Sequence, residues 1–111
     1  MSGSDGKFYL IVCVVQRGMG DKVWKSAKEA GAGGVTINFA RGMGVRERLG
    51  ILGVAISPEK EVLHIVVSEG QLEPVFDAIV KSAKLDSPGM GIAYALPVVK
   101  IAGLVEQKRD K

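Results

Sequence analysis

Two short stretches that are apolar on both faces constrain most strongly what this chain can fold into. Residues Phe8 to Val15 form the first stretch, and Glu61 to Val67 form the second, where His64 interrupts the apolar run. Both are rich in β-branched side chains and too short for free-standing helices, so each predicts a strand. A strand that is apolar on both sides needs cover on both sides. If helices cover one side, the other side predicts a closed homo-oligomer.

Two amphipathic segments lie between the predicted strands. In the first, Asp21 is the expected N-cap and Gly31 the end of a helix with one apolar side. In the second, Pro74 falls in the expected first turn. That second helix carries an apolar stripe at helical spacing, formed by Leu72, Val75, Phe76, Ile79, Val80 and Ala83. Two further strands are expected at Gly34 to Ala40 and at Gly91 to Val98, and a short extended segment at 51–56.

The order strand, helix, strand, strand, helix, strand is that of an α+β, ferredoxin-like βαββαβ fold. It predicts a four-stranded antiparallel sheet with two helices on one face. We expect a single domain over residues 7–105. Residues 1–6 are expected to be a disordered leader, and residues 106–111 a polar tail.

Composition narrows the class of protein. The chain is 47% hydrophobic with a mean hydropathy of +0.21, which agrees with extra apolar surface at a subunit interface. Its longest apolar run is far below the roughly twenty residues that span a bilayer, and the N-terminus lacks a signal-peptide pattern. These features predict a cytoplasmic protein without a membrane span. A net charge of +3 without a basic helix face argues against a nucleic-acid partner.

Glycine and positive charge concentrate together in one stretch, from Arg41 to Gly50. Glycines at alternate positions leave backbone N–H groups uncovered, and the arginines can neutralise an anion. The composition suits a phosphate-binding loop. A solvated hairpin turn is the alternative interpretation.

Three motifs follow one another along the chain: Gly34-Val35-Thr36-Ile37 leading to Arg41-Gly42-Met43-Gly44, then Lys60, then Pro88-Gly89-Met90-Gly91-Ile92. With these motifs in this order, the chain resembles the PII nitrogen-regulatory signal-transduction family from Phe8 to about Leu104. Gly34-Val35-Thr36-Ile37, followed by Arg41-Gly42-Met43-Gly44, is similar to the strand that enters the family's T-loop. Lys60 falls where the family carries a phosphate-contacting lysine, just ahead of the next strand. Pro88-Gly89-Met90-Gly91-Ile92 is similar to the family's B-loop.

The resemblance implies a homotrimer that binds an adenine nucleotide in a cleft between neighbouring subunits. ADP, AMP and ATP are candidate ligands, a different small anion such as bicarbonate is another, and no cofactor is required. The 41–57 loop would signal to a target protein, such as a transporter or an enzyme, and the chain itself is not expected to be an enzyme. The expected ligand-binding residues, including arginines that replace lost cationic contacts, are Thr36, Arg41, Gly42, Met43, Gly44, Arg46, Lys60, Gly89, Met90 and Gly91.

Several residues depart from the family's pattern. Ile92 stands in place of the B-loop lysine, and Gly103 and Val105 stand where the family has two arginines. Each charge-assisted hydrogen bond contributes roughly 1.5 to 3 kcal/mol, so triphosphate binding should be weakened. The expected T-loop is short and has no tyrosine, which argues against regulation by uridylylation.

Two other functions remain open from the residues alone. One is a ferredoxin-like oligomeric module that binds a metal ion or scaffolds a partner without sensing a nucleotide. The other is a small enzyme, for which Glu47 and His64 are the candidate bases. We expect His64 to be structural, Cys13 to be a buried small hydrophobe and Trp24 to belong to the core. No metal site is assigned.

Overall fold

The computed structural model describes residues 6–43 and 58–103. The expected tail, the 51–56 segment, Gly44 and Arg46 lie outside these ranges. Of the expected leader, only Gly6 lies inside them. In chain order, the elements are β1 (Phe8–Gln16), α1 (Gly20–Glu29), β2 (Thr36–Arg41), β3 (Glu59–Ser68), α3 (Glu69–Ser82) and β4 (Gly91–Pro97).

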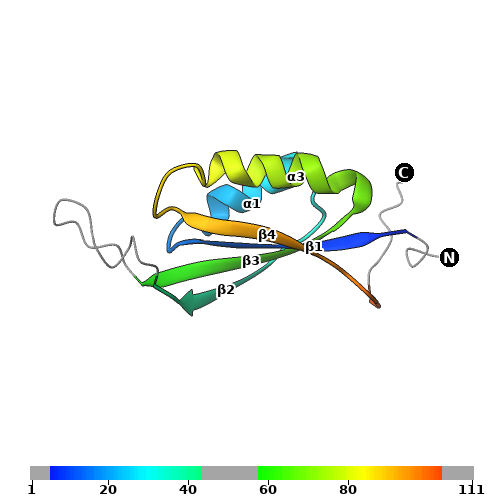
Figure 1. Ribbon diagram of the computed structural model, residues 1–111, viewed down its shortest axis with the longest axis horizontal. Helices are drawn as coiled ribbons and strands as arrows, with labels where there is room; N and C mark the ends of the chain where they lie inside the picture. The colour runs from blue at the N-terminus through cyan, green and yellow to red at the C-terminus, as the bar shows by residue number, and fades with distance from the viewer. Residues whose placement is uncertain (1–5, 44–57, 104–111) are drawn as a thin grey trace.

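The four strands form one antiparallel sheet in the order β2-β3-β1-β4. The central strands β1 and β3 therefore come from different halves of the chain. Both helices lie side by side on one face of the sheet (Figure 1). The predicted ferredoxin-like βαββαβ fold is confirmed.

The core lies between the sheet and the helices. In the β1–β3 register, Ile11 is opposite Ile65 and Cys13 is opposite Leu63, and all four side chains are fully buried. Val23 of α1 and the α3 residues Val75 and Ile79 complete this core from the helix side, with Trp24 packed at its margin. The expected burial of Cys13 is confirmed, whereas Trp24 packs against the core but is only partly buried.

The opposite face of the sheet carries the alternate residues of the same strands. Leu10, Val12 and Val14 of β1 lie here, next to Val62, His64 and Val66 of β3. On the edge strand β4, Ile92 is 56%, Tyr94 44% and Leu96 45% exposed. The helices cover only the other face, so this apolar face, called the outer face below, has no cover within the described part of one protomer.

Both helices begin earlier than the sequence pattern predicted. Met19, not Asp21, is the N-cap of α1, and Asp21 lies in the first turn. Helix α3 begins at Glu69, so Pro74 is in the second turn rather than the first. The early start of α3 is due to a capping box, in which the Oε1 atom of Gln71 accepts a 2.9 Å hydrogen bond from the backbone N–H of Ser68.

The strands next to the 44–57 segment also differ from expectation. Strand β2 runs to Arg41, and β3 already begins at Glu59, so Lys60 lies inside a strand and not ahead of it. Arg41 and Glu59 are cross-strand partners, and the backbone N–H of Gly42 donates a 2.9 Å hydrogen bond to the carbonyl of Pro58. This pairing extends the ladder beyond the apolar run from which the strand was predicted.

Within the described ranges, no helix is both long enough and apolar enough to cross a membrane.

Candidate functional site

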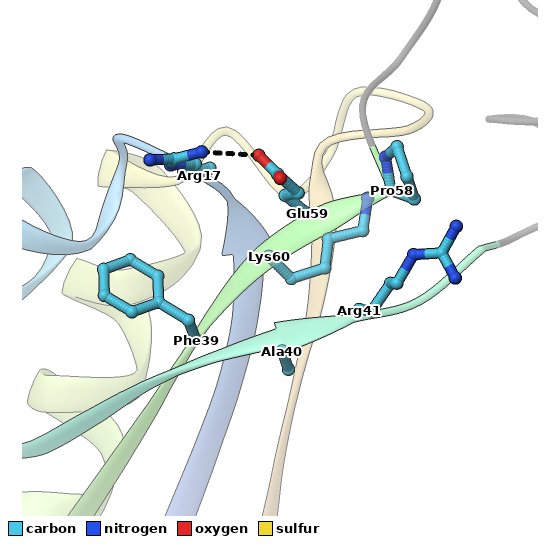
Figure 2. A pocket seen from close by; sticks show the side chains of 7 residues that line it. All are labelled: Arg17, Phe39, Ala40, Arg41, Pro58, Glu59 and Lys60. Atoms are coloured by element: carbon cyan, nitrogen blue, oxygen red, sulfur yellow. Dashed lines mark hydrogen bonds and ion pairs between the residues drawn. The ribbon is translucent and has the colours of Figure 1, made fainter.

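The end of β1, the end of β2 and the start of β3 surround an open hollow. Its volume is about 810 Å³, within the size range of small-molecule pockets. Figure 2 shows its lining side chains, which come from the end of β1, the end of β2 and the start of β3. The lining residues are Arg17, Phe39, Ala40, Arg41, Pro58, Glu59 and Lys60.

Positive charge predominates around this hollow. Arg17, Arg41 and Lys60 contribute three cationic groups, and Glu59 contributes one carboxylate. Lys60 is only 4% exposed, whereas Arg41 is an exposed residue at the end of its strand. Among the described lining residues, cationic side chains outnumber the carboxylate, and the exposed Arg17 and Arg41 are the two that a solute can reach, which favours an anion.

Glu59 is bound to Arg17 across the β1–β3 boundary. The Nη1 atom of Arg17 donates a hydrogen bond of 2.6 Å to Oε1 of Glu59, and the Arg17 backbone N–H donates to the Glu59 carbonyl at 3.2 Å. The hydrogen bond and the charge of Glu59 raise the pKa of the Arg17 guanidinium above its ordinary value. Arg17 is thus a permanent cation at the rim of the hollow.

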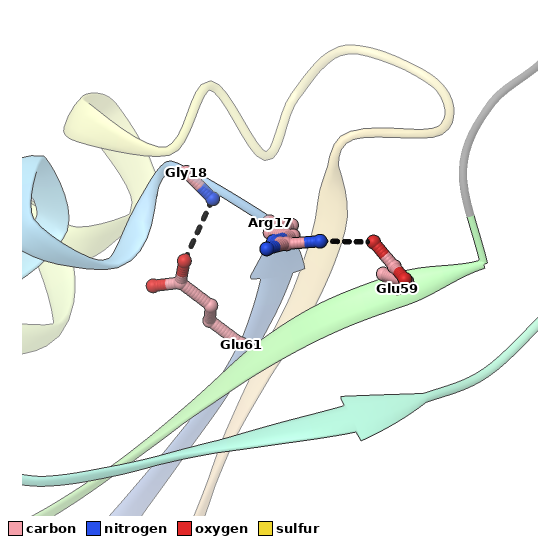
Figure 3. Close-up of polar contacts among 4 residues, drawn as sticks. All are labelled: Arg17, Gly18, Glu59 and Glu61. Carbon is pink, nitrogen blue, oxygen red and sulfur yellow. Dashed lines mark hydrogen bonds and ion pairs between the residues drawn. The ribbon is translucent and has the colours of Figure 1, made fainter.

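The neighbouring carboxylate, Glu61, is turned toward the start of α1. Its Oε2 atom accepts a 2.7 Å hydrogen bond from the backbone N–H of Gly18 (Figure 3). A β-carbon at Gly20 would overlap the other carboxylate oxygen, so a larger residue there would push this flexible side chain aside. Glu61 thereby places a negative charge at a helix N-terminus whose N-cap, Met19, makes no side-chain cap hydrogen bond.

The turn that contains Gly89 to Gly91 lies at the same end of the sheet but at the opposite edge. The Nε2 atom of Gln16 donates a 3.1 Å hydrogen bond to the Gly89 carbonyl, which ties the turn to the end of β1. Gly89 and Gly91 have φ angles of 78° and 143°, and a β-carbon at Gly91 would overlap the carbonyl oxygen of Val14. Only glycine fits at position 91 without a shift of β1.

The two glycine-containing segments lie at opposite edges of the sheet within one protomer. Arg41 ends the edge strand β2, and Gly91 begins the other edge strand, β4. Three strand spacings of about 4.8 Å separate the two edges, or about 14 Å. Within one protomer, a compact ligand such as a single phosphate group does not reach both segments.

The predicted ligand-binding residues fall into separate groups. Arg41 and Lys60 share the hollow, Gly42 continues the strand beside it, and Met43 is 70% exposed at the end of the described range. Thr36 is opposite His64, five residues along β2 from Arg41, or about 16 Å. Gly89, Met90 and Gly91 belong to the opposite edge, and Gly44 and Arg46 lie outside the described residues.

Sequence reasoning missed Arg17 and Glu59 as site residues. They are 42 positions apart in the chain and meet only because Gln16 is opposite Lys60 in the β1–β3 register. A charged residue at the end of one predicted strand and an opposite charge at the start of its partner were the available signal. That signal is readable only after the register is known.

The remaining candidate residues have structural surroundings. The Nε2–H of His64 donates a 2.9 Å hydrogen bond to Oδ1 of Asn38 on the outer face. Burial raises the pKa of the Cys13 thiol to about 11, so it keeps its proton near neutral pH. Across the residues that the structure describes, no three histidine, cysteine, aspartate or glutamate side chains gather in a group that could hold a metal ion.

Comparison with known proteins gives the following similarities. The family model described as nitrogen regulatory protein P-II matches residues 8–108. A crystal structure of Arabidopsis thaliana PII bound to citrate is similar, with a TM-score of 0.65 and 28% sequence identity. The similarity covers 86% of this chain and 81% of the Arabidopsis chain. A search of curated protein sequences found no significant match.

Proposed function

This chain belongs to the P-II nitrogen regulatory protein family, and we propose that it works as a trimeric sensor of a small anionic ligand. Proteins of this family are regulatory, and the chain is a PII-like regulatory protein. The proposed ligand is an adenine nucleotide or another small anion in the cleft between subunits. The proposed readout is the 41–57 loop, which contacts a partner protein in the cytoplasm, such as a transporter or an enzyme.

One observation carries this proposal. The Arg41-Gly42-Met43 segment and the Gly89 to Gly91 turn lie at one end of the sheet but at its opposite edges. When the outer faces of several copies associate, the β2 edge of one copy can approach the β4 edge of the next. The two segments would then become the two walls of one cleft. The exposed apolar side chains of β4 supply a surface that such an association would bury.

The two walls differ in charge, which bears on the choice of nucleotide. Arg41 and Lys60 are cationic, whereas Ile92, next to the Gly89 to Gly91 turn, carries no charge. A triphosphate gains affinity over a monophosphate mainly through additional cationic contacts. We therefore expect ATP to bind no more than about tenfold more tightly than AMP, a difference of about 1.4 kcal/mol.

The test is calorimetric titration of the purified protein with AMP, ADP, ATP, bicarbonate and citrate, each to millimolar concentration. Citrate is included because the similar Arabidopsis PII structure contains it. At least one ligand should release or absorb heat and raise the melting temperature. A complete lack of heat and of melting shift across the panel would overturn the proposal.

A matched pair of variants tests the position of the site. A β-carbon at Gly42 or at Gly33 would meet nothing within 4 Å, so both Gly42→Leu and Gly33→Leu should fold. Gly42→Leu should reduce ligand affinity at least tenfold because its side chain would fill the proposed cleft. Gly33→Leu, far from the cleft in the β2-preceding turn, should leave affinity within about twofold. Equal affinities for the two variants would place the site elsewhere.

The alternative of a metal-binding or purely scaffolding module can be tested on the same material. Native mass spectrometry of freshly purified protein should show a trimer with a retained nucleotide or small-anion mass. A retained metal mass without any organic ligand would favour the alternative. Monomeric protein would contradict the intersubunit cleft.

A further inference from the structure

The triplet Gly-Met-Gly occurs three times in the chain, at residues 18–20, 42–44 and 89–91. The first lies between β1 and α1, the second begins directly after β2, and the third leads into β4. In the antiparallel order of the sheet, these three points belong to the same end (Figure 1). One local sequence is therefore placed in three different surroundings, and its methionines can be compared directly.

The surroundings of Met19 and Met90 cover these side chains in part. Met19 is the N-cap of α1, and its side chain packs against the hydrophobic core. Met90 is partly buried in the turn that Gln16 ties to the end of β1 through the carbonyl of Gly89. Each of these two triplets begins at a glycine with positive φ, 95° at Gly18 and 78° at Gly89. The resulting turns keep both methionines against the body of the protomer.

Met43 has a different setting. Gly42 continues the β2–β3 ladder, with its N–H bonded to the Pro58 carbonyl at 2.9 Å, and Met43 follows beyond this hydrogen bond. Its side chain is 70% exposed. The glycine on each side of it in the sequence has no side chain that could shield the sulfur. Because the flanking residues are the same in all three triplets, the high exposure of Met43 comes from its place in the fold.

The other sulfur-containing residue in the described part of the chain is Cys13. It is fully buried, and burial raises the pKa of its thiol to about 11, so little of the reactive thiolate is present near neutral pH. Among the sulfur atoms that the structure describes, that of Met43 is therefore the most accessible to a solute.

We propose that the thioether of Met43 is a site of reversible oxidation by hydroperoxides, and that its sulfoxide weakens the binding of an anionic ligand in the adjoining cleft. The sulfur attacks one oxygen of the hydroperoxide, so that an S–O bond forms and the O–O bond breaks. The sulfur loses two electrons, and the hydroperoxide is reduced to water or to an alcohol. A dithiol reductase reverses the change, because it removes the oxygen as water and its two thiols become a disulfide.

The oxidised side chain differs from methionine in polarity. A sulfoxide oxygen carries partial negative charge, whereas a thioether is apolar and flexible. Met43 belongs to one wall of the proposed cleft, so an anion there would lose an apolar contact and meet an unfavourable dipole. This effect on affinity rests on the proposed function, whereas the selectivity of the oxidation does not.

The test of selectivity is limited treatment of the full chain with hydrogen peroxide, followed by trypsin digestion and peptide mass spectrometry. Cleavage after lysine and arginine places the three triplet methionines on separate peptides, residues 18–22, 42–46 and 85–100. In the folded protein, Met43 should be oxidised at least about fivefold faster than the other two, because susceptibility follows exposure. In denaturant, the three rates should agree within about twofold, because the flanking glycines are identical.

Two results would overturn the proposal at this stage. One is a smaller advantage of Met43 in the folded protein, or a faster rate at Met19 or Met90. The other is an advantage of Met43 that persists undiminished in denaturant, since it would then come from the local sequence and not from the fold.

The effect on binding is measured by calorimetric titration with AMP, and separately with citrate. The unmodified chain, Met43→Leu and Met19→Leu each receive the same peroxide dose, and each is compared with its own untreated sample. Circular dichroism melting checks that every sample is folded. For the better-bound probe, treatment should weaken affinity by about threefold to tenfold in the unmodified chain and in Met19→Leu, but by less than about twofold in Met43→Leu. Incubation with a methionine sulfoxide reductase and a dithiol should restore the affinity.

The outcomes distinguish this inference from the proposed function. If the untreated chain binds neither these probes nor the other ligands of the panel, the proposed function and the effect on affinity fail together, and the oxidation rates still decide the modification site. If a probe binds but peroxide does not weaken it, or weakens it equally in Met43→Leu, the effect of oxidation is overturned and the proposed function stands.

Discussion

The two faces of the sheet are built from the same strands and yet have opposite surroundings. On the helix side, Ile11, Leu63 and Ile65 are fully buried by elements of the same chain. On the outer face, Tyr94 and Leu96 are 44% and 45% exposed in the isolated protomer. Similar amino acids thus stabilise the protomer on one face and are available to stabilise an assembly on the other.

This difference divides the apolar side chains into two groups. One group is buried by folding of a single chain, and the other can be buried only by association of several chains. The helix-side core is closed within one chain, and its stability should not depend on protein concentration. The outer face gains its burial only by mass action, so its contribution should depend on concentration. The predictions below test that division, from the largest expected effect on protomer stability to the smallest.

The largest effect is expected from Ile65→Ala on the helix side. Ile65 is fully buried, and its truncation should lower the free energy of unfolding by about 3 to 4 kcal/mol through lost transfer energy and a cavity. Denaturant titration at two protein concentrations measures this, and the loss should be the same at both. A loss that appears only in dilute protein would show that this residue acts through the assembly.

An intermediate effect is expected from pH, through Cys13 on the helix side. Burial raises its pKa from the ordinary thiol value of 9.0 to about 11 in the folded chain, so the folded state holds the thiol proton more tightly. The resulting stability is fully present below about pH 9 and is lost as the pH rises toward 11. The loss is about 1.4 kcal/mol per pH unit across this window.

The measurement for Cys13 is denaturant titration between pH 8 and pH 11 on the unmodified chain and on Cys13→Ala. The variant should show a shallower decline because it lacks the thiol, while the lysines titrate in both proteins. Parallel pH profiles would contradict the burial of a protonated thiol.

The smallest effect on the protomer, and the largest on assembly, is expected from Leu96→Asp on the outer face. Leu96 is half-exposed in the protomer, so its replacement should change protomer stability by less than about 1 kcal/mol. The buried carboxylate should nevertheless prevent association. Light scattering should report monomers for Leu96→Asp and an unchanged oligomer for Lys28→Asp, which adds a carboxylate to the exposed side of α1. A persistent oligomer in the first variant would place the interface elsewhere.

The sequence predicted the element order well because that order depends on local periodicity. The two doubly apolar strands and the α3 stripe are each visible within about a dozen residues, and the fold follows from their succession. The apolar stripe predicts a later start for α3 than the structure shows, because the capping residues Ser68-Glu69-Gly70-Gln71 precede the stripe. The capping residues are visible in the sequence, but they are polar and so do not belong to the apolar stripe.

The site was predictable only in part, since it depends on register. Arg41 and Lys60 could be proposed because they lie near motifs with a family counterpart. Arg17 and Glu59 could not, because their contact requires two strands from different halves of the chain to pair at one particular offset. A one-residue slip in that register would turn the side chains to opposite faces.

The interleaved strand order has a consequence for how the chain acquires its structure. Strand β1 pairs only with β3 and β4, both of which follow it by more than forty residues. Neither half of the chain can therefore complete a sheet by itself, and loop closure must precede most strand pairing. We expect one cooperative folding transition at the intermediate rates of mixed α/β domains, with β1 and β3 protected together against hydrogen exchange. Cutting the backbone between β2 and β3 should leave two pieces that hold each other in a single folded body.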